Sequence, residues 1–206
     1  MKIKSVVSGL FEVNTYIVWC EETSRGVIID PGSGTDIISS EVKQNNLKIE
    51  KILITHGHVD HTEGLGKLKK LFNVPFAIGK NDVETYKMIP AQSQALDIPI
   101  TGLPEDPDIL ISEGDKIEFG NVTLDTMELP GHTAGSIAYY NNDAIFSGDV
   151  IFFNSIGRTD LPGGDYKTLF NSIRNKLFKL NPRTKIYPGH SIPTTIAAEI
   201  EENPFL

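Results

Sequence analysis

The distribution of histidine constrains this chain more than any other feature of its sequence. Of the five histidines among 206 residues, three lie in the stretch Thr-His-Gly-His-Val-Asp-His at positions 55–61. The other two, His132 and His190, each follow a Pro-Gly pair. A lone buried histidine is commonly a core residue with satisfied hydrogen bonds, but that explanation would have to apply five times over. A metal centre explains all five positions with one cause.

Spacing within the seven-residue stretch predicts a first metal ion. Side chains alternate along an extended chain, so His56, His58 and Asp60 would share one face. We predict that His56 and His58 bind this ion together with His132, which a Pro-Gly turn supplies from elsewhere in the chain. Three histidines and an open position are typical of a catalytic rather than a structural metal ion.

A second ion is predicted beside the first. His61 breaks the alternation, which is expected if the chain turns there, and it would bind this ion together with Asp60 and His190. Asp149, at the end of an apolar strand, is predicted to bridge both ions. Nitrogen and oxygen ligands without a thiolate suit zinc, iron or manganese, and of these divalent metals we favour zinc.

The composition is that of a globular protein with no attraction to polyanions. Apolar residues make up 39% of the chain and charged residues 22%, which is enough apolar material for one domain spanning residues 1–206. The formal net charge of −8 disfavours nucleic acid as a partner, because binding it depends on basic surfaces. Lys67, Lys69 and Lys70 form a local basic cluster, but their spacing is typical of the solvated face of a helix.

The sequence shows no sign of export or membrane insertion. Cys20 is the single cysteine, so an intrachain disulfide cannot form, and its strand-like setting indicates a packed thiol. We find no signal peptide and no apolar stretch long enough to span a bilayer. A cytoplasmic protein acting on a small molecule is therefore expected, and the sequence leaves its oligomeric state open.

Periodicity predicts two blocks of strands, each accompanied by helices. Strands are expected at residues 2–7, 11–20, 26–30, 49–54, 116–119, 122–129, 136–141, 144–146 and 185–187, with a short one from Pro75. Helices are expected at 35–45, 65–72, 82–88, 166–180 and 192–202. The proline-rich segment that runs on to Leu110 is predicted to lack regular structure, as a lid or as surface padding. The pattern predicts an α/β fold, a two-sheet sandwich with outer helices and ligands along one edge.

Taken together, the motifs resemble those of the metallo-β-lactamase superfamily. The resemblance rests on Thr-His-Gly-His-Val-Asp-His, Pro-Gly-His-Thr-Ala-Gly-Ser, Gly-Asp and Pro-Gly-His, and it covers nearly the whole chain from Asp30 onward. Ser-Ile-Gly-Arg-Thr-Asp at 155–160 and Glu-Asn-Pro-Phe-Leu at 202–206 are similar to segments of the short glyoxalase II-like subgroup. The resemblance implies a four-layer αββα sandwich, with the metal site at one edge of the two sheets and the same ligand roles.

Differences from other branches narrow the expected activity. Superfamily members that hydrolyse antibiotics usually have another residue in place of His61 and often a late cysteine ligand, so β-lactam hydrolysis is not expected. Nuclease branches carry an additional domain or an RNA-binding arm, and flavodiiron proteins have glutamate where His58 stands. We expect a glyoxalase II-like hydrolase that cleaves the thioester S-D-lactoylglutathione, or a related acyl-thiol, with a hydroxide that bridges two metal ions.

The alternative function is that of a persulfide dioxygenase, which is similar in sequence and uses one iron. Such an enzyme would bind its iron through His56, His132 and Asp149 alone. Gly-Arg-Thr-Asp at 157–160 resembles both branches, whereas the following Pro-Gly-Gly-Asp at 162–165 favours the hydrolase.

Further roles are predicted for residues near the ligands. Asp60 would orient the attacking hydroxide as well as bind metal. Arg158 is expected to contact a carboxylate of the substrate, with an ion pair to Asp160 or Asp165 as the alternative.

Two other residues each have two predicted roles. Asp30 would either hydrogen-bond a ligand histidine or form the turn before Pro31, and Thr133 would either assist His132 or bond locally. Asn14 and Tyr16 are expected to be structural.

Overall fold

Alternating apolar residues build two six-stranded sheets. The computed structural model describes all residues from 1 to 206. The first sheet has the spatial order β1 (Lys2–Ser8), β2 (Val13–Trp19), β3 (Arg25–Ile29), β4 (Lys48–Ile54), β5 (Phe76–Gly79) and β6 (Ile109–Ile111). The second has the order β14 (Thr194–Thr195), β13 (Lys185–Pro188), β10 (Ala144–Gly148), β9 (Ile137–Tyr140), β8 (Val122–Glu128) and β7 (Lys116–Phe119).

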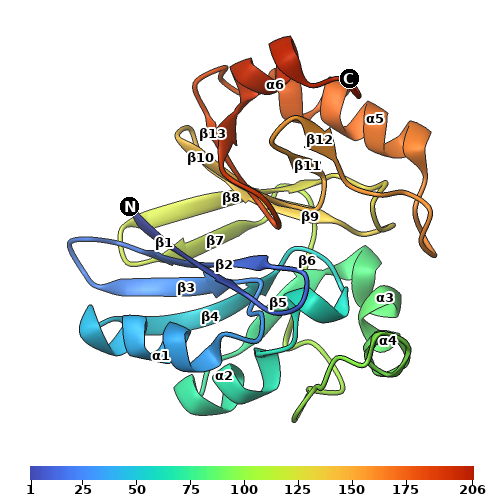
Figure 1. Ribbon diagram of the computed structural model, residues 1–206. Coiled ribbons are helices and arrows are strands. Elements are labelled where there is room, and N and C mark those ends of the chain that lie inside the picture. The colour runs from blue at the N-terminus through green and yellow to red at the C-terminus, as the bar shows by residue number, and fades with distance from the viewer.

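Helices cover the outer face of each sheet and give the molecule four layers, as Figure 1 shows. α1 (Thr35–Gln44) and α2 (Leu65–Phe72) lie against the first sheet. α5 (Tyr166–Asn175) and α6 (Ile196–Glu202) lie against the second. The αββα architecture expected from the sequence is therefore confirmed.

Three apolar clusters fill the three interfaces between these layers. In β3, Val27 and Ile29 point into the cluster between the sheets, whereas Ile28 points toward the helices. In β4 the pattern repeats, with Leu53 between the sheets and Ile52 toward the helices. Neighbouring side chains of these strands enter different clusters because successive side chains of a strand point to opposite faces of the sheet.

Parallel pairing in both sheets brings distant segments to one edge of the sandwich. β3, β4 and β5 are parallel, and they lead into Asp30, Thr55 and Lys80. β10 and β13 are parallel as well, and they lead into Asp149 and Gly189. Ligands of α/β sheets collect at the carboxyl ends of strands, so this edge is where the chemistry is expected.

The structure corrects several predicted boundaries in the second half of the chain. The helix predicted at 166–180 ends at Asn175, and a separate 3-10 turn, η3 (Leu177–Lys179), follows it. The last helix begins at Ile196 rather than at residue 192, because β14 precedes it. A small hairpin of β11 (Ile151–Phe152) and β12 (Ser155–Ile156) lies outside the predicted strands.

The proline-rich segment is more regular than predicted. It follows the 3-10 turn η2 (Lys80–Asp82) and α3 (Val83–Lys87), and it contains the helix α4 (Ile89–Leu96) before reaching β6. Pro90 lies in the first turn of α4, where a missing backbone N–H breaks no helical hydrogen bond. The prolines of this segment therefore do not prevent a helix.

Two expectations concern the whole chain: the absence of a membrane-spanning segment and the number of domains. No helix in this structure combines the length and the apolar character that crossing a bilayer requires. The assignment of residues 1–206 to one domain stays a prediction.

Replacement of Leu124 by alanine tests the cluster between the sheets. Leu124 is completely buried there, so Leu124→Ala should lower the free energy of unfolding by about 2–5 kcal/mol. Denaturant unfolding measures the change. Leu71→Ala is the control, because Leu71 is 57% exposed and its loss should cost about 0.5 kcal/mol or less. Equal effects of the two substitutions would contradict this account of the core.

Candidate metal centre

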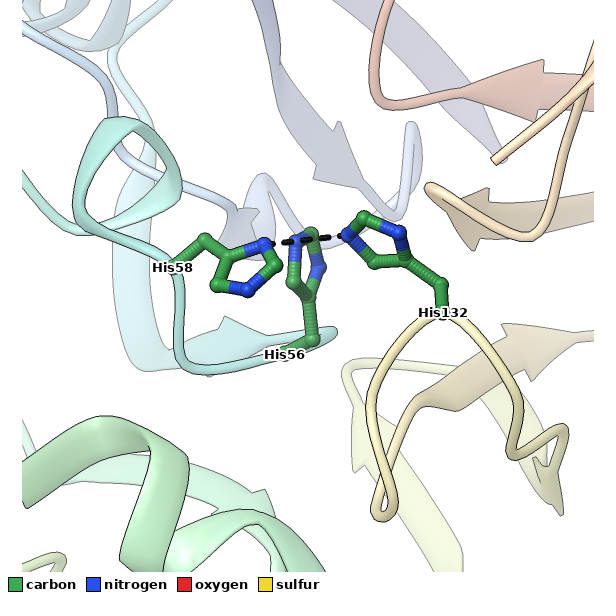
Figure 2. A group of neighbouring side chains, drawn as sticks. All are labelled: His56, His58 and His132. Carbon is green, nitrogen blue, oxygen red and sulfur yellow. Dashed lines mark hydrogen bonds between the residues drawn. The ribbon is translucent and has the colours of Figure 1, made fainter. Parts of the chain in front are cut away.

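Seven side chains from four segments converge at the edge of the sandwich. Figure 2 shows three of them, His56, His58 and His132, pointing toward one another. His58 Nδ1 lies 3.0 Å from His132 Nε2, although 74 residues separate the two in sequence. The structure brings together every predicted ligand: His56, His58, Asp60, His61, His132, Asp149 and His190. Their binding of metal stays a prediction.

The donor atoms of these side chains form overlapping groups, each compact enough for one ion. One group consists of His56, His58 and His132, and another of Asp60, His61 and His190. A third group combines His56, His61 and Asp149. Within each group the donor atoms all lie within 4.8 Å of one another. The first two groups match the two ligand sets predicted from spacing.

Asp149 lies between these two groups. Its Oδ1 atom is 3.3 Å from His61 Nε2, and its Oδ2 atom is 3.5 Å from His190 Nε2 and 3.7 Å from His132 Nε2. One carboxylate oxygen therefore faces the second group while the other faces both. This is the position that the bridging role requires.

Unpaired buried atoms show that the residues fit divalent cations. His56 Nε2, His61 Nε2 and Asp149 Oδ1 are all buried without a hydrogen-bond partner. Buried polar atoms without partners are costly, and a cation with nitrogen and oxygen ligands would satisfy all three. The turn of His190 approaches closely enough that a Cβ atom on Gly189 would collide with Asp149 Oδ1 and His61 Cε1.

Backbone carbonyl groups orient two of the histidines. His132 Nδ1 lies 2.8 Å from the Arg158 carbonyl oxygen, and His190 Nδ1 lies 2.8 Å from the Phe11 carbonyl oxygen. A carbonyl oxygen only accepts hydrogen bonds, so each Nδ1 carries the proton. Each Nε2 is then left with a lone pair that points into the centre.

Asp30, which follows the end of β3, orients the histidine loop (residues 55–61). Its Oδ1 atom accepts a 2.7 Å hydrogen bond from the Thr55 amide, and its Oδ2 atom accepts one of 2.6 Å from the Thr55 hydroxyl. The same Oδ2 atom lies 3.0 Å from His61 Nδ1, while the Thr55 hydroxyl lies 3.1 Å from His56 Nδ1. Of the two roles predicted for Asp30, the structure shows the hydrogen bond to a ligand histidine.

The other supporting residues also have defined partners. The hydroxyl groups of Thr133 and Ser136 lie 2.8 Å apart, so Thr133 forms the local bond. Asn14 Nδ2 and the Tyr16 hydroxyl donate to the Pro188 carbonyl oxygen at 3.0 and 2.7 Å. Asn14 and Tyr16 are therefore structural, as expected, and what they hold in place is the turn that carries the fifth histidine.

The extended segment predicted for the histidine motif, from His56 to Asp60, is longer than the one in the structure. His58 is extended, with ψ of 150°, but Val59–His61 forms a 3-10 turn, η1. Asp60 therefore does not share an extended face with His56 and His58. The turn instead directs Asp60 and His61 together toward the second group.

Burial keeps two histidines of the first group neutral. Complete burial lowers the pKa of His56 well below its usual value, and the neighbouring imidazoles lower it further. Burial, followed by the proximity of His132, lowers the pKa of His58 to about 4. Neutral imidazoles keep the lone pairs that metal binding needs.

The second group has the opposite electrostatics. Burial by itself opposes the charge on His61, but Asp149, Asp60 and Asp30 raise its pKa well above the usual value. Burial also opposes ionisation of Asp149, yet His61 and the other histidines hold the pKa of that carboxyl below its usual range. The Asp149 carboxylate therefore stays ionised, and a cation would replace the proton between it and His61.

Asp82, which was not identified from the sequence, links two of the loops that carry predicted ligands. Its Oδ2 atom accepts a 2.5 Å hydrogen bond from the amide of Gly57, and its Oδ1 atom accepts one of 3.2 Å from the amide of Gly135. Gly57 lies between the two histidines of the first loop, and Gly135 lies in the turn of His132. Asp82 follows β5 much as Asp30 follows β3, and that recurrence is the signal that was available in the sequence.

A pocket of about 640 Å³ lies over the ligand cluster, and Arg158 lines it. The exposed Arg158 guanidinium forms two 2.8 Å hydrogen bonds with the Asp160 carboxylate. The ion pair predicted as the alternative role is thus formed. Contact of Arg158 with substrate stays a prediction.

Comparisons with known proteins agree with this geometry. The family model described as "Metallo-beta-lactamase superfamily" matches residues 8–190. The hydroxyacylglutathione hydrolase GloC of Haemophilus influenzae is 34% identical over 209 residues, which cover 100% of this chain and 98% of that protein.

Two solved structures are similar over nearly their whole length. The BLEG-1 B3 metallo-beta-lactamase has a TM-score of 0.91 and 33% identity, and 99% of each chain is covered. TTHA1623, solved in a di-iron-bound form, has a TM-score of 0.89 and 33% identity, with 98% of this chain and 100% of that chain covered. The resemblance inferred from the motifs is confirmed.

Asp149→Asn tests the bridging position. The amide removes a negative charge and one oxygen ligand, so the metal retained after dialysis should fall from about two ions per chain to one or fewer. Elemental analysis of the dialysed protein measures this. The exposed Asp143→Asn is the matched control and should retain the full content. Two tightly held ions in Asp149→Asn would remove Asp149 from the ligand set.

Asp82→Asn tests the link between the ligand loops. An amide group in place of the carboxylate leaves Gly57 N–H or Gly135 N–H without an acceptor. We expect metal affinity to fall by about 10- to 100-fold, measured by competition with a chelator. Asp36→Asn, with a 90% exposed side chain, is the control. A folded Asp82→Asn protein with unchanged affinity would show that the link has no effect on the centre.

Proposed function

The chain belongs to the metallo-beta-lactamase superfamily, and from this premise we propose that it is a dinuclear thioester hydrolase of the glyoxalase II type. The superfamily and the GloC relative support a metal-dependent hydrolase. The observation that carries the finer proposal is the convergence of two complete ligand groups on one shared carboxylate.

We assign the ligands to two divalent cations. His56, His58 and His132 would hold one, and Asp60, His61 and His190 the other, with Asp149 between them. Bound divalent cations supply hydroxide near neutral pH and polarise a carbonyl oxygen. Zinc remains our first choice, and the di-iron form of TTHA1623 supports iron as an alternative.

Asp60 is proposed to orient the attacking water. Its carboxylate lines the pocket, and its Oδ2 atom lies 3.3 Å from His190 Nε2 and 3.6 Å from His61 Nε2. Burial opposes its ionisation, but His61 and His190 hold its pKa below the usual value. An ionised carboxylate at this position accepts a hydrogen bond from water at the floor of the pocket.

A thioester suits a site with this inventory of side chains. The titratable residues of the pocket are all assigned to metal or, in Arg158, to the ion pair with Asp160. None remains as a strong general acid, and a thiol leaves readily without one. Arg158 is proposed to exchange Asp160 for a carboxylate of the substrate. A small-molecule substrate and a cytoplasmic location stay part of the proposal.

Two other activities define the alternatives. A persulfide dioxygenase would use only His56, His132 and Asp149, and would leave His61 Nε2 buried without a partner. The similarity to BLEG-1 makes hydrolysis of a β-lactam the second alternative.

Thiol release from S-D-lactoylglutathione is the experiment that tests the proposal. Protein reloaded separately with zinc, manganese and iron should release thiol without consuming oxygen, and Asp149→Asn should be at least 100-fold slower (about 3 kcal/mol). Oxygen uptake on glutathione persulfide, or turnover of a chromogenic cephalosporin without thioester cleavage, would refute the proposal in favour of the corresponding alternative.

A further inference from the structure

One wall of the pocket beside the metal centre is apolar and open to solvent. Met88, Ala95 and Leu96 line it, and Met88 and Leu96 are each 45% exposed. Phe11, which is 43% exposed, lines the same pocket from the loop between β1 and β2. Adjacent exposed apolar side chains mark a ligand-binding surface when they adjoin a reactive centre.

This wall is fixed to the metal-binding loop by hydrogen bonds of two polar side chains, Gln92 and Thr85. Gln92 of α4 accepts a 2.9 Å hydrogen bond from the Val59 amide. The Thr85 hydroxyl donates to Asp82 at 2.9 Å. Apart from the metal ligands and Arg158, Gln92 and Thr85 are the only polar side chains that line the pocket. A hydroxyl group on a substrate lying against this wall would lose its water and would find only these two side chains, each already hydrogen-bonded within the protein.

The charged part of a substrate has one place to bind, and it lies on a different segment. Arg158 is the only lysine or arginine among the lining residues, and it follows β12 together with Leu161 and Pro162. Asp160 already neutralises it. Apart from the proposed cations, the pocket therefore offers much apolar surface and little positive charge.

We infer that this pocket selects thioesters with an apolar acyl chain, such as butyryl or hexanoyl, over hydroxyacyl thioesters such as lactoyl. The inference rests on the proposed thioesterase function. Water adds to the carbonyl carbon, the C–S bond breaks, and the products are a carboxylate, a proton and the free thiol. The acyl chain lies along Met88, Ala95 and Leu96, and the thiol portion extends toward Arg158.

A series of N-acetylcysteamine thioesters tests the selection, because their thiol portion carries no charge. From propionyl to butyryl to hexanoyl, kcat/KM should rise by up to about fourfold for each methylene buried. The propionyl ester should also exceed the D-lactoyl ester, which differs by one hydroxyl. A flat series, or preference for lactoyl, would overturn the inference while leaving thioester hydrolysis established.

Binding of thioethers, which cannot be hydrolysed, separates the inference from the proposed activity. Calorimetry should show S-hexyl-N-acetylcysteamine binding at least tenfold more tightly than S-ethyl-N-acetylcysteamine. Tight hexyl binding without cleavage of any thioester would refute the hydrolase and retain the apolar site. Equal binding of the two thioethers would refute the apolar site whatever the enzyme cleaves.

A matched pair of variants locates the selection on α4. Leu96→Ser should reduce the hexanoyl-to-propionyl ratio of kcat/KM at least threefold. Leu71→Ser is the control, since Leu71 is an exposed leucine near the end of another helix, α2, and lies outside the pocket. An unchanged ratio in Leu96→Ser would remove this wall from the acyl site.

Discussion

The crowding of five imidazoles and two carboxylates at one edge of the sandwich is the constraint on which the rest of the structure depends. The two sides of this cluster differ in protonation. One side holds neutral histidines, and the other holds His61, which lies among carboxylates and favours the protonated form. Three of the donor atoms have no partner within the protein. Such a cluster persists only if cations satisfy it and if the surrounding chain prevents the side chains from turning away.

That second requirement explains why the site lies at this edge of the sandwich. The parallel strands β3, β4 and β5 end together, and each is followed by a residue of the network. Asp30 follows β3, the histidine loop follows β4, and Asp82 lies at the end of the turn after β5. Both aspartates accept hydrogen bonds from the histidine loop, so the loop is held by two carboxylates outside the predicted ligand set. The other sheet contributes Asp149 and His190 through its own parallel pair.

The metal centre and the wall of the pocket differ in chemical character. The centre is polar and its side chains are committed to one another, whereas the wall formed by α4 presents apolar groups to solvent. Gln92 joins the two, because it lies on α4 and hydrogen-bonds the loop that carries the ligands. Under the proposed function, the metal centre would determine which bond is broken, and α4 would contribute to the choice of substrate.

The sequence by itself determined which side chains gather at the centre, the two groups they form and the layered fold. These residues could be identified because histidines are few and lie in short motifs. The fold could be predicted because strands buried on both faces appear in the sequence as short apolar runs, such as residues 27–29 and 52–54. Only the tertiary structure decided what supports and surrounds the centre. Asp82 accepts hydrogen bonds from amides 25 and 53 residues away, and the ion pair of Arg158 with Asp160 was one of its two predicted roles. The partners of a lone carboxylate depend on which strands are neighbours, and that is fixed by packing between segments rather than by any local pattern.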